Sequence, residues 1–423
     1  MTRLRAEALA ESRIADPSLA PEGEQKIQWV ARHAHVLNRL ARERLSDGAL
    51  RGRRVAVVVH LEAKTAYLAT LFADAGAAVV AAGSNPGSTQ DSVAAALAAR
   101  GVRVYARHGV SRPEFMDDLL AVADTGPEII VDDGAEVTSR IVEHRPELRE
   151  RLRGVTEETT TGLARLRAME AAGRLTFPAV AANDAACKHL FDNRYGTAQA
   201  TMQAILRLTN LSGAGKRYCV IGYGYVGKGL ADYAEGLGGL VSVIEIDPVA
   251  GVQAFMDGHR VANRADALAD ADYVLTATGG IEAVSRDDFA LLKDGAVLAN
   301  AGHHDREIDV RALEELAGPA EEVRPGVTRY TLDGKRIYLL VRGALVNIAG
   351  LDGNPVEIMD LSFSVQALAA HHLAANDLAP GIHSFPAELD REIAQAKLAT
   401  IGVGPEELRP SQRAFFEQWT TWE

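Results

Sequence analysis

The segment 218–247, YCVIGYGYVGKGLADYAEGLGGLVSVIEID, shapes the interpretation of the whole chain. Its apolar ends predict two strands, and its central part predicts a helix that follows a glycine turn. Gly222, Gly224 and Gly227 form the pattern G-x-G-x-x-G. The first glycine permits a tight turn, the second lets the backbone approach a pyrophosphate, and the third allows close packing of helix on strand. The segment therefore predicts a dinucleotide-binding unit.

An acidic residue near the end of the second predicted strand indicates which dinucleotide binds. Glu245 follows Gly227 by 18 residues. This is close to the spacing of about 20 at which a carboxylate accepts hydrogen bonds from the adenosine ribose. The same charge would repel the 2′-phosphate of NADP. The sequence therefore favours NAD as the cofactor.

Length and composition limit the classes of protein to be considered. The chain has 423 residues, so two or three domains are expected. A net charge of −12 without a basic stripe argues against a nucleic-acid partner. The sequence has no signal-peptide pattern and no apolar run long enough to span a membrane, so we expect a cytoplasmic protein with no membrane partner. Cys187 and Cys219 cannot form a disulfide framework, which fits a reducing compartment.

Alternating strand and helix patterns predict a parallel sheet before the glycine turn. Residues 1 to about 50 are expected to be helical, followed by strands at 55–59, 78–82, 102–105 and 128–131 and helices at 92–100 and 114–123. His60 and Asp133 would lie at the carboxyl ends of strands, where such sheets bind ligands. After the glycine turn we expect strands at 272–277 and 296–299 and an antiparallel pair within 327–340.

Polar residues gather between the two predicted sheets. The segment EETTTG occupies 157–162, and Lys188 lies four residues before Asp192, on the same face if the segment is helical. Such a pair is more often a solvated surface pair. His303, His304 and Asp305 could suggest a metal ion, but adjacent loop side chains rarely share one, so we expect no metal.

Several motifs occur in one order along the chain. They are STQD at 88–91, DDG at 132–134, EETTTG at 157–162, FDN at 191–193, GYGYVGKG at 222–229, EID at 245–247, NAGHHDREID at 300–309 and LVN at 345–347. By this ordered set the chain resembles the S-adenosylhomocysteine hydrolase family over nearly its whole length. HLEAKTA at 60–66 and the short C-terminus resemble the archaeal and thermophilic branch, which can use the inosine analogue.

The resemblance implies an α/β fold with two doubly wound domains and a cleft between them. The expected parts are a substrate-binding domain at 1–190 completed by 354–390, a Rossmann NAD-binding domain at 191–353, and a C-terminal dimerisation segment at 391–423. Hinges are expected near 185–195 and 347–355. A homo-oligomer, a tetramer or dimer, is implied as well. A helix at 388–398 and an aromatic tail would lie at its interface, the tail residues being Phe415, Phe416, Trp419 and Trp422.

The family's reaction uses NAD without net oxidation. Bound NAD oxidises the 3′-hydroxyl of a purine nucleoside, which acidifies the C4′ hydrogen so that the 5′ substituent can be eliminated. Water then adds, and the hydride returns. By resemblance, Lys188 and Asp192 handle the 3′-hydroxyl proton, Glu158 holds the ribose diol, and His60, Asp133 and His303 act at C5′. We expect a lowered pKa for Lys188, caused by burial beside the nicotinamide ring.

The resemblance also implies binding residues. The expected NAD contacts are Thr159, Thr160, Thr161, Asn193, Gly222, Gly224, Tyr225, Val226, Gly227, Glu245, Thr278, Ala301, Gly302, His303 and Asn347. The expected substrate contacts are His60, Glu62, Lys64, Thr89, Gln90, Asp133, Glu158, Lys188, Asp192, Asn354 and Met359.

The chain departs from the family at several positions. Glu62 and Lys64 stand where many members contact the adenine edge with Thr and Glu, and a lysine, which only donates, favours a base with a carbonyl group. Asn354 replaces a histidine beside the substrate, and Thr197 replaces a cysteine near the nicotinamide. A C-terminal lysine and tyrosine that reach a neighbouring subunit's NAD are absent, so we expect easier cofactor loss.

Two alternatives to the hydrolase remain open. One is a nucleoside dehydratase of the kind that forms the exocyclic alkene of angustmycin, which Asn354 favours. The other is a non-catalytic, NAD-bound regulator, against which the retained catalytic residues argue.

Overall fold

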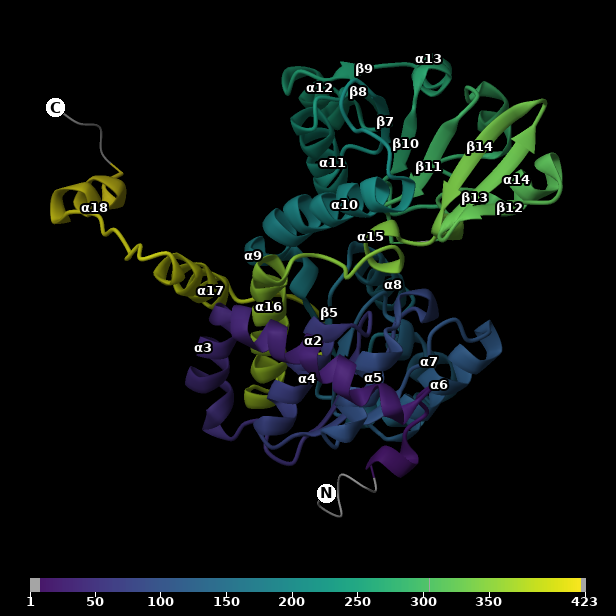
Figure 1. Ribbon diagram of the computed structural model, residues 1–423. Helices are drawn as coiled ribbons and strands as arrows, with labels where there is room; N and C mark the ends of the chain where they lie inside the picture. The colour runs from purple at the N-terminus through teal and green to yellow at the C-terminus, as the bar shows by residue number, and fades with distance from the viewer. Residues whose placement is uncertain (1–7, 304, 420–423) are drawn as a thin grey trace.

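The computed structural model describes residues 8–303 and 305–419, which form two lobes, each built on its own sheet (Figure 1). In these residues the first sheet has seven strands, all parallel, in the order β15-β6-β5-β4-β1-β2-β3. Their bounds are β1 Arg54–Val58, β2 Ala78–Ala82, β3 Arg103–Tyr105, β4 Ile129–Asp132, β5 Gly154–Glu157, β6 Pro178–Ala181 and β15 Gly381–Ser384.

The second sheet has eight strands among the described residues, in the order β12-β13-β14-β11-β10-β7-β8-β9. They are β7 Arg217–Ile221, β8 Leu240–Ile244, β9 Arg260–Val261, β10 Tyr273–Thr276, β11 Ala296–Asn300, β12 Glu321–Arg324, β13 Val327–Leu332 and β14 Lys335–Leu340. The strands from β14 to β9 pair in parallel, whereas β12, β13 and β14 form an antiparallel edge. This is a doubly wound sheet with an antiparallel edge added.

Helices cover both sheets. In the first lobe they are α2 Ala20–His33, α3 His35–Glu43, α4 Ala63–Asp74, α5 Asp91–Ala99, α6 Arg112–Asp124, α7 Glu136–His144, α8 Thr160–Ala171 and α16 Val356–Ala375. In the second lobe they are α10 Thr197–Thr209, α11 Tyr225–Gly236, α12 Pro248–Met256, α13 Arg264–Asp270 and α14 Val310–Ala317. The short helices α9 Ala186–Lys188 and α15 Val346–Ala349 lie at the crossings between the lobes.

The predicted elements are confirmed where their patterns were strong. Every strand and helix predicted before the glycine turn from 55 onward is present, with ends within two residues of the prediction. The early helical region is α2 and α3, and residues 1–7 of that prediction lie outside the described residues. Because β1 and β4 are buried on both faces, their side chains form continuous apolar runs, which is why they were easy to recognise.

The region 157–197, between the two predicted sheets, contains strands and helices that were not predicted. Strands β5 and β6 lie within or beside it, and both belong to the first sheet. Strand β15, which was not predicted, pairs with β6 in parallel after the chain returns from the second lobe. The first sheet is therefore completed by late sequence, although the boundaries at 190 and 354 stay a prediction.

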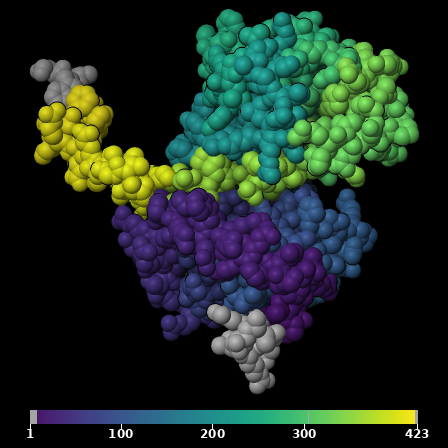
Figure 2. Space-filling model, in the orientation of Figure 1, coloured from purple at the N-terminus to yellow at the C-terminus, as the bar shows by residue number. Residues whose placement is uncertain are grey.

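The chain crosses between the lobes twice. The first crossing contains a π-helical segment, His189–Gly196, that leads into α10. The second crossing contains α15 and ends at α16, which packs on β4 and β5. Figure 2 shows residues of this second crossing as a band between the two lobes. π-helical segments are frequent at functional sites, so the first crossing is a candidate for the functional site.

The C-terminal segment leaves the first lobe as an arm. Helix α17 Ala387–Thr400 contains the predicted helix 388–398, and α18 Pro410–Glu417 lies beyond it, away from both lobes (Figure 1). Phe416 and Trp419 are exposed by 72% and 94%, whereas Trp422 lies outside the described residues. The interface predicted for this tail stays a prediction. No helix in the described part of the chain has the length and apolar character needed to cross a membrane.

Candidate active site

A cleft of about 420 Å³ lies between the carboxyl ends of the two sheets. It is lined by all six predicted catalytic residues, His60, Asp133, Glu158, Lys188, Asp192 and His303. The predicted binding residues that line it are Glu62, Lys64, Thr159, Thr160, Asn193, Gly224, Tyr225, Val226, Thr278, Ala301, Gly302, Asn347, Asn354 and Met359. The structure therefore brings together side chains from both sheets and both crossings.

Six predicted residues do not line this cleft: Thr89, Gln90, Thr161, Gly222, Gly227 and Glu245. Thr89 donates to the Asn85 carbonyl at 3.2 Å, and the Gln90 amide oxygen accepts from Lys26 at 3.4 Å. These bonds tie the two side chains into the first lobe, so their predicted contact with substrate stays a prediction.

A buried cluster of charges forms one side of the cleft. Lys188, which is 4% exposed, lies with its Nζ 2.9 Å from Asp192 Oδ2 and 3.5 Å from Glu158 Oε1. Lys188 also donates to the Asn193 side-chain oxygen at 2.7 Å. Glu158 is held from α16, where Ser362 and Gln366 donate to its two oxygens at 2.6 Å and 2.5 Å. The lysine is thus fixed between two carboxylates that are themselves fixed.

The pKa of Lys188 is raised, so the expectation of a lowered pKa is wrong for this arrangement of residues. Burial does act in the expected direction, but the charges of Asp192 and Glu158 outweigh it. Burial raises the pKa of Glu158 to about 7, although Lys188 opposes that shift. Glu158 therefore changes its charge near neutral pH, whereas Lys188 keeps its proton there.

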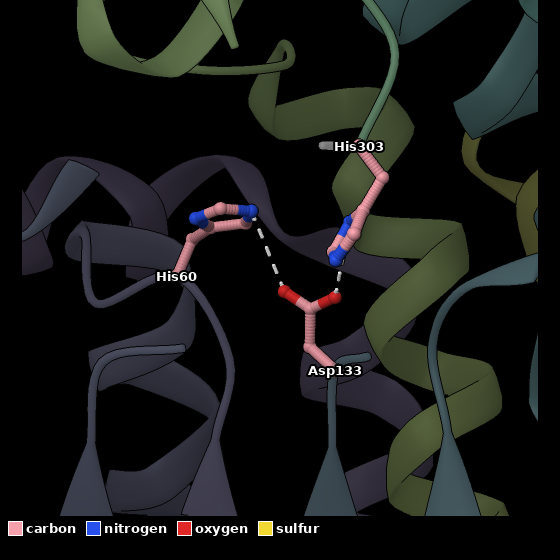
Figure 3. A group of neighbouring side chains, drawn as sticks. All are labelled: His60, Asp133 and His303. Carbon is pink, nitrogen blue, oxygen red and sulfur yellow. Dashed lines mark ion pairs between the residues drawn. The ribbon is translucent and has the colours of Figure 1, made fainter. Parts of the chain in front are cut away.

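A second group of side chains faces this cluster. Asp133 lies between two imidazoles, with Oδ2 3.4 Å from His60 Nε2 and Oδ1 3.7 Å from His303 Nδ1 (Figure 3). Ser88 contacts His60 Nδ1 at 2.6 Å, and Ser84 donates to Asp133 at 2.8 Å. His60 and Asp133 come from the first sheet, whereas His303 comes from the loop after β11 of the second. The group therefore forms only when the lobes face each other.

Burial and neighbouring groups shift the pKa of Asp133 and of His303. Burial acts to raise the pKa of Asp133, but the two histidines, the Ser84 hydrogen bond and Lys188 together outweigh it, so the pKa is lowered. Burial lowers the pKa of His303, which Asp133 only partly offsets. One ligand atom from each of the three lies within 4.8 Å of the others, so they could hold a metal ion. The expectation of no metal stays a prediction.

Opposite these groups lies a glycine cradle formed by Gly222, Gly224 and Gly227, of which Gly224 lines the cleft itself. A Cβ atom at Gly222 would lie 2.6 Å from the Ala277 carbonyl, and one at Gly227 would lie 1.9 Å from the Gly222 carbonyl. No atom lies within 4 Å of a Cβ at Gly224, which opens onto the N-terminus of α11. Close packing at two glycines and open space at the third are what a dinucleotide pyrophosphate requires. The residues fit the cofactor.

Glu245 directly follows β8, as predicted for the ribose-binding acid. Its oxygens accept hydrogen bonds from backbone amides of Tyr223 at 2.5 Å and Ile246 at 2.6 Å. These bonds fix the carboxylate at the rim of the glycine turn. Its contact with a ribose stays a prediction.

The residues that sequence reasoning missed hold catalytic residues or residues of the cofactor side in place. They are Ser84, Ser88, Asn183, Glu157, Glu307, Ser362 and Gln366. The segment 357–368, EIMDLSFSVQAL, contained one usable signal, because polar residues recur there on an otherwise apolar helix. Such residues need buried partners.

Two doubly wound lobes, with a glycine cradle on one side of a cleft and buried acid–base groups on the other, define a dinucleotide-dependent enzyme of the Rossmann class. Residues 11–149 match the family model described as S-adenosyl-L-homocysteine hydrolase, and residues 193–353 match its NAD binding domain. The chain belongs to the S-adenosyl-L-homocysteine hydrolase family. It is an enzyme, and NAD is its cofactor, as predicted.

Relatives with two different names are similar over nearly the whole chain. An adenosylhomocysteinase of Thermotoga maritima is 48% identical over 94% of this chain and 99% of the relative. An adenosylhomocysteinase of Thermococcus kodakarensis is 47% identical over 96% and 97%. An S-inosyl-L-homocysteine hydrolase of Methanopyrus kandleri is 44% identical over 97% of each chain. The similarity to both groups leaves the purine base to be decided by this chain's own residues.

Proposed function

We propose that the protein catalyses the reversible hydrolysis of a purine-nucleosyl homocysteine, S-adenosyl- or S-inosyl-homocysteine, to the nucleoside and homocysteine. The observation that carries the proposal is one cleft in which Lys188, Asp192 and Glu158 face His60, Asp133 and His303. Cofactor oxidation of a ribose hydroxyl and elimination at C5′ need proton transfer at two separate places. The cleft has one cluster of buried side chains for each of these two proton transfers.

Gly222, Gly224 and Gly227 would hold NAD, which when bound would supply a reversible acceptor for the C3′ hydride. Lys188 and Asp192 receive the 3′-hydroxyl proton, and Glu158 accepts hydrogen bonds from the ribose diol. Because the pKa of Lys188 is raised by its carboxylate neighbours, the lysine is a cation in this arrangement, and it must lose a proton before it can act as a base.

The second group acts after the C4′ proton has left. The C5′–sulfur bond breaks, and the departing thiolate takes a proton to become homocysteine. Water then adds its oxygen to C5′ and a hydrogen to C4′, which restores the saturated sugar. His60, Asp133 and His303 lie where they can donate the proton to sulfur and accept one from water. The ion pairs with Asp133 hold the two imidazoles in place.

Glu62 and Lys64 are proposed to bind the purine edge. Lys64 is 6% exposed, and its Nζ lies 2.7 Å from Glu62 Oε2 and donates to the Asp352 carbonyl at 2.8 Å. A lysine has no acceptor for the exocyclic amine of adenine but can donate to the carbonyl of hypoxanthine. These contacts favour the inosyl compound.

The test is to incubate the NAD-loaded protein with S-adenosylhomocysteine, S-inosylhomocysteine and a 6′-hydroxylated psicofuranosyl adenine, and to identify products by mass spectrometry. Release of homocysteine is expected from the first or second compound. Loss of water from the third, with neither homocysteine compound consumed, would replace the hydrolase by the dehydratase. Lys188→Ala should abolish cofactor reduction, whereas the surface variant Lys216→Ala should leave it unchanged; full activity of Lys188→Ala would exclude both reactions.

The proposal also covers the assembly and the location of the protein. A homo-oligomer, a tetramer or dimer, would cover the exposed aromatic residues of the C-terminal arm. Both cysteines are free and buried, in accord with the cytoplasmic location that the sequence predicts. Sedimentation of the full chain measures the oligomeric state.

A further inference from the structure

Asn354 joins the two crossings between the lobes. From the second crossing its amide nitrogen donates to Asp192 Oδ1 in the first crossing at 2.5 Å, and to Thr197 Oγ1, at the start of α10, at 3.2 Å. Its amide oxygen accepts from Asn347 Nδ2 at 2.8 Å. The Asn354 side chain thus makes a hydrogen bond to a catalytic carboxylate and is itself held in orientation.

The two oxygens of Asp192 have different partners because of this bond. Oδ1 accepts from Asn354, whereas Oδ2 lies 2.9 Å from Lys188 Nζ. Ser362 Oγ, at 3.5 Å from Oδ2, is a weaker third neighbour. Tilting the carboxylate plane would lengthen both close contacts, so Asn354 helps to fix the orientation in which Asp192 faces the lysine.

The backbone makes room for this contact. A Cβ atom at position 196 would lie 3.1 Å from Asn354 Nδ2 and 3.2 Å from Asn354 Cβ, which is tighter than ordinary packing. Gly196 ends the π-helical segment that presents Asp192. The absence of a side chain there lets Asn354 approach the segment closely.

We propose that Asn354 is a positioning residue for the proton-transfer pair Lys188 and Asp192. The inference rests on the proposed function and assigns Asn354 a role in chemistry rather than in affinity alone. An amide donates at every pH, so Asp192 keeps one neutral donor while protons move around it. The charged groups that face the pair are Glu158, 3.5 Å from Lys188, and Asp133, whose charge also acts on the lysine.

The test uses three substitutions at this position. Asn354→Asp keeps the shape but places a second carboxylate against Asp192, so that the two share a proton. Asn354→Ala removes the donor without adding charge, and Asn354→His restores one N–H donor. Asn210→Asp, at an exposed helix end, makes the same chemical change far from the cleft. All four variants are prepared as full chains, loaded with NAD, and checked for thermal unfolding and cofactor content.

The readout is the rate at which adenosine or inosine reduces the bound cofactor, followed by the near-ultraviolet absorbance of NADH across a range of pH. Asn354→Asp is expected to lower the maximal rate about 10- to 100-fold, the worth of a charge-assisted hydrogen bond. Its acidic limb should move to higher pH, with the nucleoside concentration for half-maximal rate little changed. Asn354→Ala should lose about tenfold, and Asn354→His should recover part of that loss.

Each outcome decides between the two claims. An unsubstituted enzyme that reduces its cofactor with neither nucleoside overturns the proposed function and, with it, this inference. An active enzyme whose Asn354→Asp variant keeps the same maximal rate and pH profile overturns the inference alone. A change confined to the half-saturating concentration also overturns it, because Asn354 would then act only in binding.

Discussion

At the carboxyl end of the first sheet β4 finishes on Asp132, whereas at the carboxyl end of the second sheet β11 finishes on Asn300. Asp132 accepts from the Thr138 hydroxyl at 2.6 Å, and Asn300 Oδ1 accepts from the Gly302 amide at 2.8 Å. Both side chains tie down the turn after the strand. The first lobe uses a carboxylate for this purpose, and the second uses a neutral amide.

Each lobe also contains a buried glutamate that holds neighbouring turns in place. Glu157 accepts from the amides of Gly134, Ala135 and Thr159, each at 2.9 Å, and so joins the turns that carry Asp133 and Glu158. Glu307 likewise accepts from Thr278 and Gly279 at 3.0 Å and 2.7 Å.

Each glutamate needs a glycine beside it. A Cβ at Gly162 would lie 2.0 Å from Glu157 Cδ, and one at Gly302 would lie 1.6 Å from Glu307 Oε1. The two lobes thus share a way of fixing loops. They differ in what the loops present, which is charged side chains in the first lobe and, apart from the His303 side chain, backbone groups for a dinucleotide in the second.

The largest expected effect comes from Asp133→Asn, which removes a charge at the carboxyl end of the first sheet and leaves the second sheet unchanged. We expect turnover to fall by about 10²- to 10⁴-fold, because the two imidazoles lose the carboxylate that orients them. Cofactor content and its reduction by a nucleoside should persist, since the glycine cradle is untouched. Turnover is measured as homocysteine release, with Asp124→Asn, a surface carboxylate paired with Arg145, as the control. Unchanged turnover would remove Asp133 from the mechanism.

The charged residues at the carboxyl end of the first sheet and the glycine cradle could be predicted from the sequence because both follow recognisable strands. The G-x-G-x-x-G turn and the polar residue after a buried strand are local patterns, and their side chains lie where strand order places them. Resemblance to a family supplied the roles. All six predicted catalytic residues reach one cleft.

The remainder of the site depends on contacts between distant segments. Gln366 and Ser362 hold Glu158 from more than two hundred residues away, and β15 enters the first sheet after the second lobe is complete. No periodic pattern in the local sequence predicts such long-range contacts. The raised pKa of Lys188 was missed for the same reason, because it depends on how closely two carboxylates approach.

Exchanging each buried glutamate for glutamine sharpens the comparison further. One carboxylate oxygen becomes an NH₂ group that cannot accept, which costs about 1–3 kcal/mol per buried donor left unpaired. Glu157→Gln is expected to lower turnover while NAD is retained, because Glu157 holds the turns of Asp133 and Glu158. Glu307→Gln is expected to lower the NAD content, because Thr278 and Gly279 line the cleft on the cofactor side.

Chromatography of released NAD and homocysteine assays measure the two effects on the same samples. Glu143→Gln, on the exposed face of α7, serves as the matched control for both. If the two variants lost NAD content and homocysteine release to the same extent, the proposed difference in role between the two lobes would be wrong.

The smallest expected effect concerns how stability depends on pH. Burial raises the pKa of Asp132 to about 7, against the hydrogen bonds from Thr138 that lower it. The folded chain then binds this proton more tightly than the unfolded chain, whose aspartates titrate near about 4. The free energy of unfolding therefore falls as pH rises between these values.

Asp132→Asn gives the first sheet the same strand-end residue type that the second sheet has at Asn300. It should flatten this fall by about 1 kcal/mol or more across the window, whatever it does to absolute stability. Urea unfolding at several pH values measures the slope. Asn300→Asp should steepen the slope in the same window, because burial would raise the pKa of the new carboxyl. An unaltered slope in both variants would mean that the two strand ends do not differ in the charge they bury.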